Sequence, residues 1–158
     1  MESTFTIRDI TEADYDEWAA LWAQYNAFYG RVGLTALPQH IIQSTWARLL
    51  DESEPVYGLV AEHDGRLVGL AHYIFHRNTI TIENTAYLQD LFSDPEKREQ
   101  GIGRGLISAF YERAQQVGTV GVYWHTQGTN KAAMRLYDKV ATNTEFVVYR
   151  HKVGRKPT

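Results

Sequence analysis

Residues 87–107 read YLQDLFSDPEKREQGIGRGLI and join three local signals in one continuous stretch. The apolar, aromatic-rich Tyr87–Phe92 predicts a strand, and Pro95 with the charges around it ends that strand. Arg98 and the glycines between 101 and 105 then begin an amphipathic helix. Glycines at a helix start allow a ligand to approach the backbone, and free N–H groups at the positive dipole end attract phosphate. The stretch therefore predicts a phosphate-binding loop between strand and helix.

Composition predicts one globular domain over residues 1–158, with its core at about 5–153, large enough to fold without disulfides. The net charge of −3 argues against a general nucleic-acid or anionic-membrane surface, so we expect neither as a partner. The chain has no cysteine, which excludes disulfides, thiolate catalysis and cysteine-based metal sites. Met1 leads into polar residues and no long apolar run follows, so we expect a soluble, cytoplasmic protein.

Apolar periodicity predicts the order of elements along the whole chain. We expect strands at 5–10, 56–62, 67–75, 87–92, 120–125 and 145–153. We expect helices after a Thr11–Asp14 capping pair, from Pro38, at 101–117 and at 130–140. Asp64-Gly65 predicts a hairpin turn between the second and third strands. This order predicts an α+β fold, with a mixed, mostly antiparallel central sheet flanked by helices.

The sequence does not match the motifs of two common phosphate-binding loops. A Walker A loop ends in Gly-Lys followed by Ser or Thr, whereas this sequence has Gly103-Arg104-Gly105. The dinucleotide fingerprint requires a glycine or alanine where this sequence has Leu106, and no acidic residue follows on a second strand at the usual distance. A nucleotide-binding domain thus stays only a third option, which predicts affinity for NAD or ATP but not for coenzyme A.

The residues from Arg98 to Gly103 match a third kind of phosphate-binding loop. Arg98-Glu-Gln-Gly-Ile-Gly103 resembles the Arg/Gln-x-x-Gly-x-Gly/Ala loop of the GNAT superfamily, the Gcn5-related N-acetyltransferases. The stretch from Asn130 through Ala133 to Tyr137 resembles the Asn-x-x-Ala-x-x-x-Tyr motif of that family's next helix. The phrases at 87–92, 122–126 and 136–141 resemble the small fungal and bacterial acetyltransferases that act on histone tails, polyamines or D-amino acids.

This resemblance implies the GNAT fold and acetyl-CoA as co-substrate, with no metal. Backbone N–H groups at 100–105 would hold the pyrophosphate, with Arg98 and Arg104 as charge partners. Main-chain groups of the strand would contact the pantetheine and polarise the carbonyl near Leu91. The residues that the resemblance assigns to the cofactor are Leu91, Ser93, Arg98, Glu99, Gln100, Gly101, Ile102, Gly103, Arg104, Gly105, Asn130 and Tyr137.

Tyr137 is the candidate general acid. It follows Asn130 by seven residues, which is two helical turns, so both side chains share one face. A phenol with a pKa of ~10 lies close to a thiol with a pKa of ~8.5, so it can give a proton to the departing sulfur. The lack of cysteine supports direct attack of the amine rather than an acyl-enzyme.

The general base is left open by the residues themselves. Diamine acetyltransferases, more distant relatives, carry a glutamate in the strand where this sequence has Gln89, which cannot accept a proton. Strand alternation turns Asp90 to the opposite face from Gln89, and Glu83 and His125 are the other candidates. Bulk water is an equal alternative.

Each motif also has a purely structural interpretation. The glycines can form a tight turn, Asn130 a plain helix cap, Tyr137 a packing contact and Asp90 a hydrogen bond to a neighbouring loop. His72 and His76 share a strand face but lack a third ligand, so no metal site is expected. The aromatic residues of the first helix are expected to be mostly core, with some lining the acceptor cleft.

Taken together, the sequence predicts an acetyl-CoA-dependent N-acetyltransferase that forms a ternary complex. The expected acceptor is a primary amine of a small molecule, such as a polyamine or amino acid, and less so a protein lysine. A homodimer is the family expectation. The alternative is a non-catalytic acyl-CoA-binding or sensor module on the same fold, which Gln89 keeps open.

Overall fold

The computed structural model describes residues 4–98 and 100–156. Contacts divide the chain into two compact units, one that runs to His125 and a second that begins at Thr126. The first unit holds the sheet and three of the helices, and the second holds one helix and the C-terminal segment. No helix among the described residues is long and apolar enough to cross a membrane.

The described residues of the first unit form a five-stranded sheet in the order β1-β2-β3-β4-β5. Neighbouring strands are antiparallel from β1 to β4, whereas β4 and β5 are parallel. The fold is therefore α+β with a mixed, mostly antiparallel sheet, which confirms the predicted class. The strands are Thr6–Asp9, Val56–His63, Arg66–His76, Thr85–Ser93 and Gly121–Tyr123.

The turn between β2 and β3 is the one that the sequence predicts. Asp64 and Gly65 both have positive φ, at 51° and 75°, so the two central residues adopt the left-handed conformation of a tight hairpin. Asp and Gly tolerate that conformation better than other residues do. This turn sets the register between β2 and β3.

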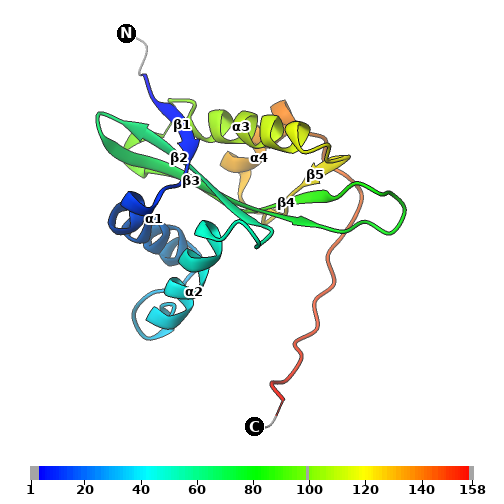
Figure 1. Ribbon diagram of the computed structural model, residues 1–158, viewed down its shortest axis with the longest axis horizontal. Coiled ribbons are helices and arrows are strands. Elements are labelled where there is room, and N and C mark those ends of the chain that lie inside the picture. Colours follow the sequence, from blue (N-terminus) through cyan, green and yellow to red (C-terminus); the bar gives the residue numbers. More distant parts are fainter. Residues whose placement is uncertain (1–3, 99, 157–158) are drawn as a thin grey trace. The chain divides into compact units, whose positions relative to one another are not determined.

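Helices cover both faces of the sheet (Figure 1). Helix α1 (Tyr15–Phe28) packs on β3 and α2 (Gln39–Leu50) on β2, whereas α3 (Ile102–Gln116) lies across the opposite face. The predicted capping pair is present, because the Thr11 N–H donates to Asp14 Oδ2 at 2.8 Å. Pro38 stands immediately before α2, as expected.

The core has one layer on each side of the sheet. On the α1 side, Trp18 is completely buried and its ring lies 5.1 Å from that of Trp22. On the α3 side, Leu106, Ile107 and Phe110 are completely buried. Burial of each of these side chains contributes about 1.5–3 kcal/mol to folding. The aromatic face predicted for the first helix is core, as expected, apart from the more exposed Tyr29.

The second unit differs from the prediction. Helix α4 (Lys131–Val140) matches the expected helix at 130–140. The strand predicted at 145–153 is absent, and residues from 141 to 156 have no helix or strand. The alternation of apolar residues there satisfied the strand pattern, but a strand also needs a neighbour for its N–H and C=O groups. In this structure Phe146 and Tyr149 are exposed by 91% and 93%.

Candidate active site

The start of α3 has the geometry of an anion-binding loop. Gly101, the residue before the helix, has φ of 81°, and an added Cβ would meet no atom within 4 Å. The first turn of a helix leaves its N–H groups without intrahelical partners, here those of residues 101–104. Ile102 is buried and fixes the helix start on β3, since a Cβ at Gly69 would lie 2.7 Å from Ile102 Cγ2. The free N–H groups at the start of α3 therefore lie beside open space, and the buried Ile102 holds them in place.

Gly105 lies where α3 packs closely on the sheet. Its N–H already donates to the Gly101 carbonyl at 2.9 Å, so this N–H is used within the helix. A Cβ at Gly105 would lie 2.9 Å from Phe5 Cε2 and 3.0 Å from Ile7 Cδ1. The glycine is needed because α3 crosses the side chains of β1 and its preceding residue at close range.

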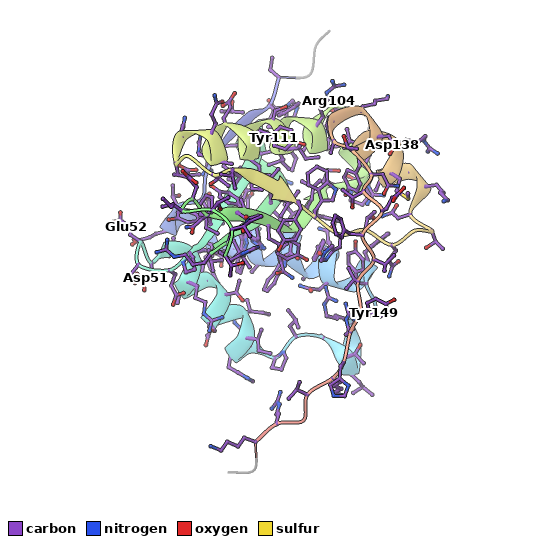
Figure 2. The ribbon with its side chains drawn as sticks, turned by 90° about the vertical axis from the view of Figure 1, so that its right-hand side faces the viewer. Asp51, Glu52, Arg104, Tyr111, Asp138 and Tyr149 are labelled. Carbon is purple, nitrogen blue, oxygen red and sulfur yellow. The ribbon has the colours of Figure 1, made fainter. Side chains whose placement is uncertain are left out.

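The charged residues of the loop face outward. Arg98, Gln100 and Arg104 are exposed, and Figure 2 shows Arg104 on α3. The Arg98 guanidinium carbon lies 6.0 Å from the centre of the Phe92 ring, at the limit of a cation–π contact. Glu99 lies outside the described residues. Both arginines are thus available to an anion at the helix start.

Beside this loop, one edge of β4 extends past its neighbour. Strand β5 pairs only with Thr85, Ala86 and Tyr87, so β4 continues for six residues beyond that pairing. Leu91 and Ser93 belong to this extension, and both are half-buried. Main-chain groups on that edge have no strand partner among the described residues and can pair with an extended ligand.

A bulge in β4 reverses the faces of its side chains. Asp90 pairs with His72 and Leu88 pairs with Tyr73, so Gln89 is the extra residue without a partner on β3. Paired residues of antiparallel strands point to the same face. Asp90 therefore faces α1, whereas Leu88 faces α3, although they are two residues apart. Gln89 itself is exposed.

Asp90 ends a buried polar network on the α1 side. The Trp18 indole donates to His72 Nε2 at 2.9 Å, and His72 Nδ1 lies 2.8 Å from Asp90 Oδ2. Because an indole N–H can only donate, His72 Nε2 accepts and Nδ1 carries the hydrogen that it gives to Asp90. Asp90 is only 8% exposed, so its carboxylate depends on such donors. The sequence pattern placed His72 among core or surface histidines and gave no signal of this pairing.

The same carboxylate interacts with the hydroxyl of Tyr25 on α1. Burial and the adjacent Asp90 charge raise the pKa of Tyr25 well above its usual value, so the residue stays a neutral phenol and a hydrogen-bond donor. The Tyr25 ring packs edge-on against Phe92, with 6.2 Å between ring centres. Phe92 also contacts Arg98, so this network adjoins the glycine-rich loop.

His125 follows β5 at the end of the β4–β5 pairing from which β4 continues, in an exposed group of aromatic residues. Its Nδ1 is 3.4 Å from the Tyr87 hydroxyl, and its ring centre lies 5.8 Å from that of Tyr123. The Tyr123 hydroxyl lies 2.8 Å from His76 Nε2. Unlike the buried Asp90, His125 is thus open to solvent.

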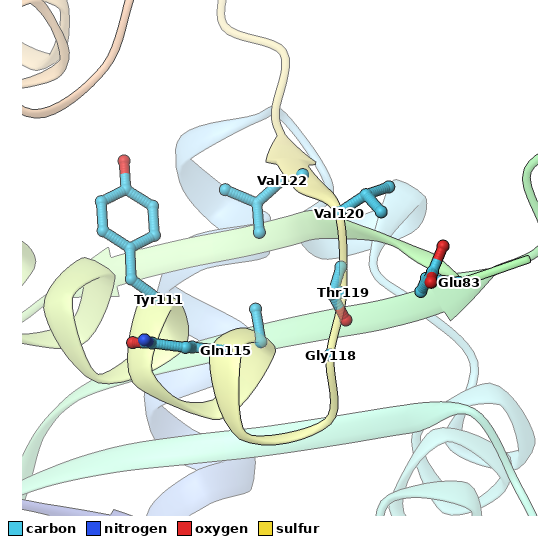
Figure 3. A pocket seen from close by; sticks show the side chains of 9 residues that line it. Glu83, Tyr111, Gln115, Gly118, Thr119, Val120 and Val122 are labelled. Atoms are coloured by element: carbon cyan, nitrogen blue, oxygen red, sulfur yellow. The ribbon is translucent and has the colours of Figure 1, made fainter. Parts of the chain in front are cut away.

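Glu83 is not brought to the loop. It lines an open pocket of about 500 Å³ with Tyr111, Gln115 and Thr119 (Figure 3). This pocket adjoins the C-terminal half of α3, whereas the glycine-rich loop is at its start, and the helix is about 22 Å long. Burial raises the pKa of Tyr111 above its usual range, so its phenol stays neutral.

In the second unit, Asn130 caps α4. Its Oδ1 accepts from the Ala133 N–H at 3.3 Å, the plain cap that was one of its two interpretations. Tyr137 is half-buried on α4. Among residues 4–98 and 100–156, no three histidine, aspartate or glutamate side chains cluster in a way that could hold a metal ion.

Comparisons with known proteins give matches over most of the chain. Residues 10–141 match the family model described as "Acetyltransferase (GNAT) family". The D-amino-acid N-acetyltransferase HPA3 of Saccharomyces cerevisiae is 34% identical over 146 residues, 91% of this chain and 88% of that protein.

Two solved structures share the fold at lower identity. An aminoglycoside acetyltransferase from an uncultured soil metagenomic sample, in complex with sisomicin, has a TM-score of 0.81 at 20% identity. The aminoglycoside N-acetyltransferase AAC(6')-Iy in complex with CoA has a TM-score of 0.80 at 18% identity. Each similarity covers 96% of this chain and 97% of the other.

Proposed function

The chain belongs to the GNAT family of acetyltransferases, and from that premise we propose that it moves an acetyl group from acetyl-CoA directly to a primary amine of a small molecule, either an amino acid or a polyamine. The observation that carries this proposal is the helix start at Gly101. Its left-handed backbone, open space and free N–H groups lie on the same unit as the extended edge of β4.

The expected chemistry follows from the two reactants. The amine nitrogen attacks the thioester carbonyl, the C–N bond forms, the C–S bond breaks, and the sulfur leaves as the CoA thiolate. Residues 101–104 and the two loop arginines hold the pyrophosphate through hydrogen bonds and charge. Leu91, Ser93 and the unpaired edge of β4 hold the pantetheine arm and orient the carbonyl.

Tyr137 is proposed as the acid that protonates the leaving thiolate, and Asn130 as a cofactor contact in addition to its cap. For the base, the contacts of the three candidates favour His125. Asp90 is buried and already accepts from His72, and Glu83 lies in the pocket beside the far half of α3. His125 is exposed, and an imidazole can serve as a general base.

The acceptor class rests on the curated relative at 34% identity, whose name assigns it D-amino acids. The acidic net charge suits a cationic acceptor such as a polyamine. Gln89, exposed at the bulge, favours a second candidate function, a sensor that binds acyl-CoA without turning it over.

An amine panel separates the two functions. Purified protein and acetyl-CoA are mixed with amino acids, polyamines, aminoglycosides and a lysine peptide, and thiol release is measured. We expect release that saturates with amino acids or polyamines, and a bell-shaped pH–rate profile whose acidic limb disappears in His125→Ala but persists in Asp90→Asn and Glu83→Gln. Tight binding of acetyl-CoA without release above the rate of hydrolysis with any amine would favour the sensor.

We also propose that the chain is a cytoplasmic homodimer. The absence of cysteine suits a reducing compartment. Phe146 and Tyr149 expose large apolar surfaces, which suit contact with a second copy. Light scattering should give a mass near twice 18.1 kDa, and the double variant Phe146→Ser/Tyr149→Ser should lower it. A monomeric parent protein would contradict the dimer.

A further inference from the structure

Arg31 stands out in the first unit as a positioned cation without a counter-charge. It follows α1 directly, and its backbone N–H donates to the Asn26 carbonyl at 2.9 Å. Its side-chain Nε donates to Asn26 Oδ1 at 2.7 Å, and Asn26 is buried. Asn26 is held in turn by its own bond to the Trp22 carbonyl at 3.0 Å. The guanidinium is thus fixed from one side.

Two tyrosine rings contact the same guanidinium. Its central carbon lies 5.9 Å from the ring centre of Tyr25 and 5.6 Å from that of Tyr29. These contacts restrict the guanidinium, and among the described residues its side chain bonds only through Nε, so both terminal nitrogens are available to a ligand. Across the part of the chain that the structure describes, no carboxylate pairs with Arg31. A planar, oriented and unpaired guanidinium matches the fork geometry of a carboxylate.

Tyr25 connects this cation to the buried network beside β4. Its ring contacts Arg31, and its hydroxyl interacts with the Asp90 carboxylate. A positive and a negative group therefore flank one aromatic ring. Asp90 is the neighbour of Leu91, whose strand edge is expected to hold the thioester. A ligand with a carboxylate at Arg31 would extend toward the place where the amine must react.

Around Arg31, the end of α1 and the chain that follows it expose apolar side chains. Phe28, Val32 and Leu34 are all exposed, and Leu34 has no part of its side chain covered. Three exposed apolar residues next to an oriented cation form a surface for a ligand that has both a carboxylate and an apolar side chain.

We propose that Arg31 is a specificity-determining residue that binds the carboxylate of the acceptor, so that the acceptor is a free amino acid with an apolar side chain rather than a polyamine. This inference rests on the proposed acetyl transfer. The ammonium end of the amino acid lies toward Asp90 and Tyr25, the carboxylate pairs with the terminal nitrogens of Arg31, and the side chain covers Phe28, Val32 and Leu34.

The test compares each amino acid with its carboxamide and its decarboxylated amine. Leucine and phenylalanine, in both enantiomers, are measured against leucinamide, phenylalaninamide, isoamylamine and phenethylamine. We expect the parent protein to prefer the free acids in kcat/KM. Arg31→Gln should lower kcat/KM for the acids by about 10- to 100-fold, mainly through KM, and change it less than about twofold for the amides and amines. Arg31→Lys should recover part of the loss, since it restores the charge without the fork.

Arg48→Gln is the matched control, because Arg48 is an exposed arginine on α2. Arg48→Gln should leave kcat/KM unchanged for every acceptor. An equal loss of kcat/KM for acids and amides in Arg31→Gln would assign Arg31 a merely structural role and overturn the inference. So would a parent protein that acetylates polyamines or amides as well as the free acids, although acetyl transfer itself would then stand.

A binding measurement keeps the inference testable if no amine is turned over. With saturating CoA, N-acetylleucine should raise the thermal unfolding midpoint of the parent protein more than N-acetylleucinamide does. That difference should vanish in Arg31→Gln and persist in Arg48→Gln. Equal shifts for both compounds in the parent protein would overturn the role of Arg31 without reference to catalysis.

Discussion

Gly101 and Gly118 flank α3 and have nearly the same backbone, with φ of 81° and 77°. An added Cβ would meet no atom within 4 Å at either position. Alanine should therefore cost a similar free energy of unfolding at both, about 1–2 kcal/mol, because the left-handed region disfavours any Cβ. Only the Gly101 site adjoins the free N–H groups of the helix start.

We predict that Gly101→Ala weakens acetyl-CoA binding by about 10-fold, since its methyl group stands where the phosphate approaches. Gly118→Ala should bind acetyl-CoA as the parent does. Isothermal titration measures both, and urea unfolding measures the common strain. Equal affinities in the two variants would place the pyrophosphate elsewhere.

Tyr137 carries the prediction about the leaving group. Tyr137→Phe keeps the ring but removes the proton donor, so turnover should fall by about 100-fold while the Kd for acetyl-CoA changes little. Tyr149→Phe is the control in the same unit, because that tyrosine is 93% exposed. Steady-state kinetics and titration give the two quantities. Unchanged turnover in Tyr137→Phe would remove this residue from the mechanism.

At the scale of elements, the junction between β1 and α1 depends on one ion pair. Arg8 donates two bonds of 2.8 Å to Asp14, and these bonds hold the pKa of the Asp14 carboxyl below its usual 3.8 despite partial burial. The pKa of Asp14 is lower in the folded state than in the unfolded state. The ion pair therefore contributes fully to the free energy of unfolding above about pH 4, and this contribution is lost as the pH falls through the folded-state pKa.

Asp14→Asn should therefore lower the free energy of unfolding by about 1.5–3 kcal/mol at pH 7, and by less at pH 3. Urea unfolding at the two pH values measures this change. Asp16→Asn is the control, since Asp16 is exposed in the next turn. A pH-independent effect of Asp14→Asn would contradict the role of its charge.

Local sequence patterns predicted most helices and strands because residues typical of turns and helix caps mark where these elements begin and end. The Asp64-Gly65 turn, the Thr11–Asp14 pair and the glycine before α3 are short-range signals. The strand predicted at 145–153 was wrong because pairing is a long-range property that alternation does not report. The bulge at Gln89 was missed for a related reason, since a strand reveals an extra residue only against its partner.

At the scale of the whole molecule, the sequence predicted the glycine-rich start of α3 but not the side-chain contacts around Asp90 and Arg31. The loop is continuous in sequence, from Arg98 to Arg104. The Asp90–His72–Trp18 network joins residues 54 positions apart, and Arg31 is positioned by rings that the sequence assigns to core. Side chains that meet only in the folded protein are not separated by a regular spacing in the sequence, so no sequence pattern predicts their contacts.

Whether acetyl reaches an amine nitrogen is the central claim at this scale, and isotopic transfer tests it most directly. Protein is mixed with acetyl-CoA labelled with carbon-13 in the acetyl group and with both leucine and a polyamine, and the products are followed by mass spectrometry. We expect labelled N-acetylleucine and free CoA in equal amounts. Label that stays in acetyl-CoA, or appears only as free acetate, would contradict this claim.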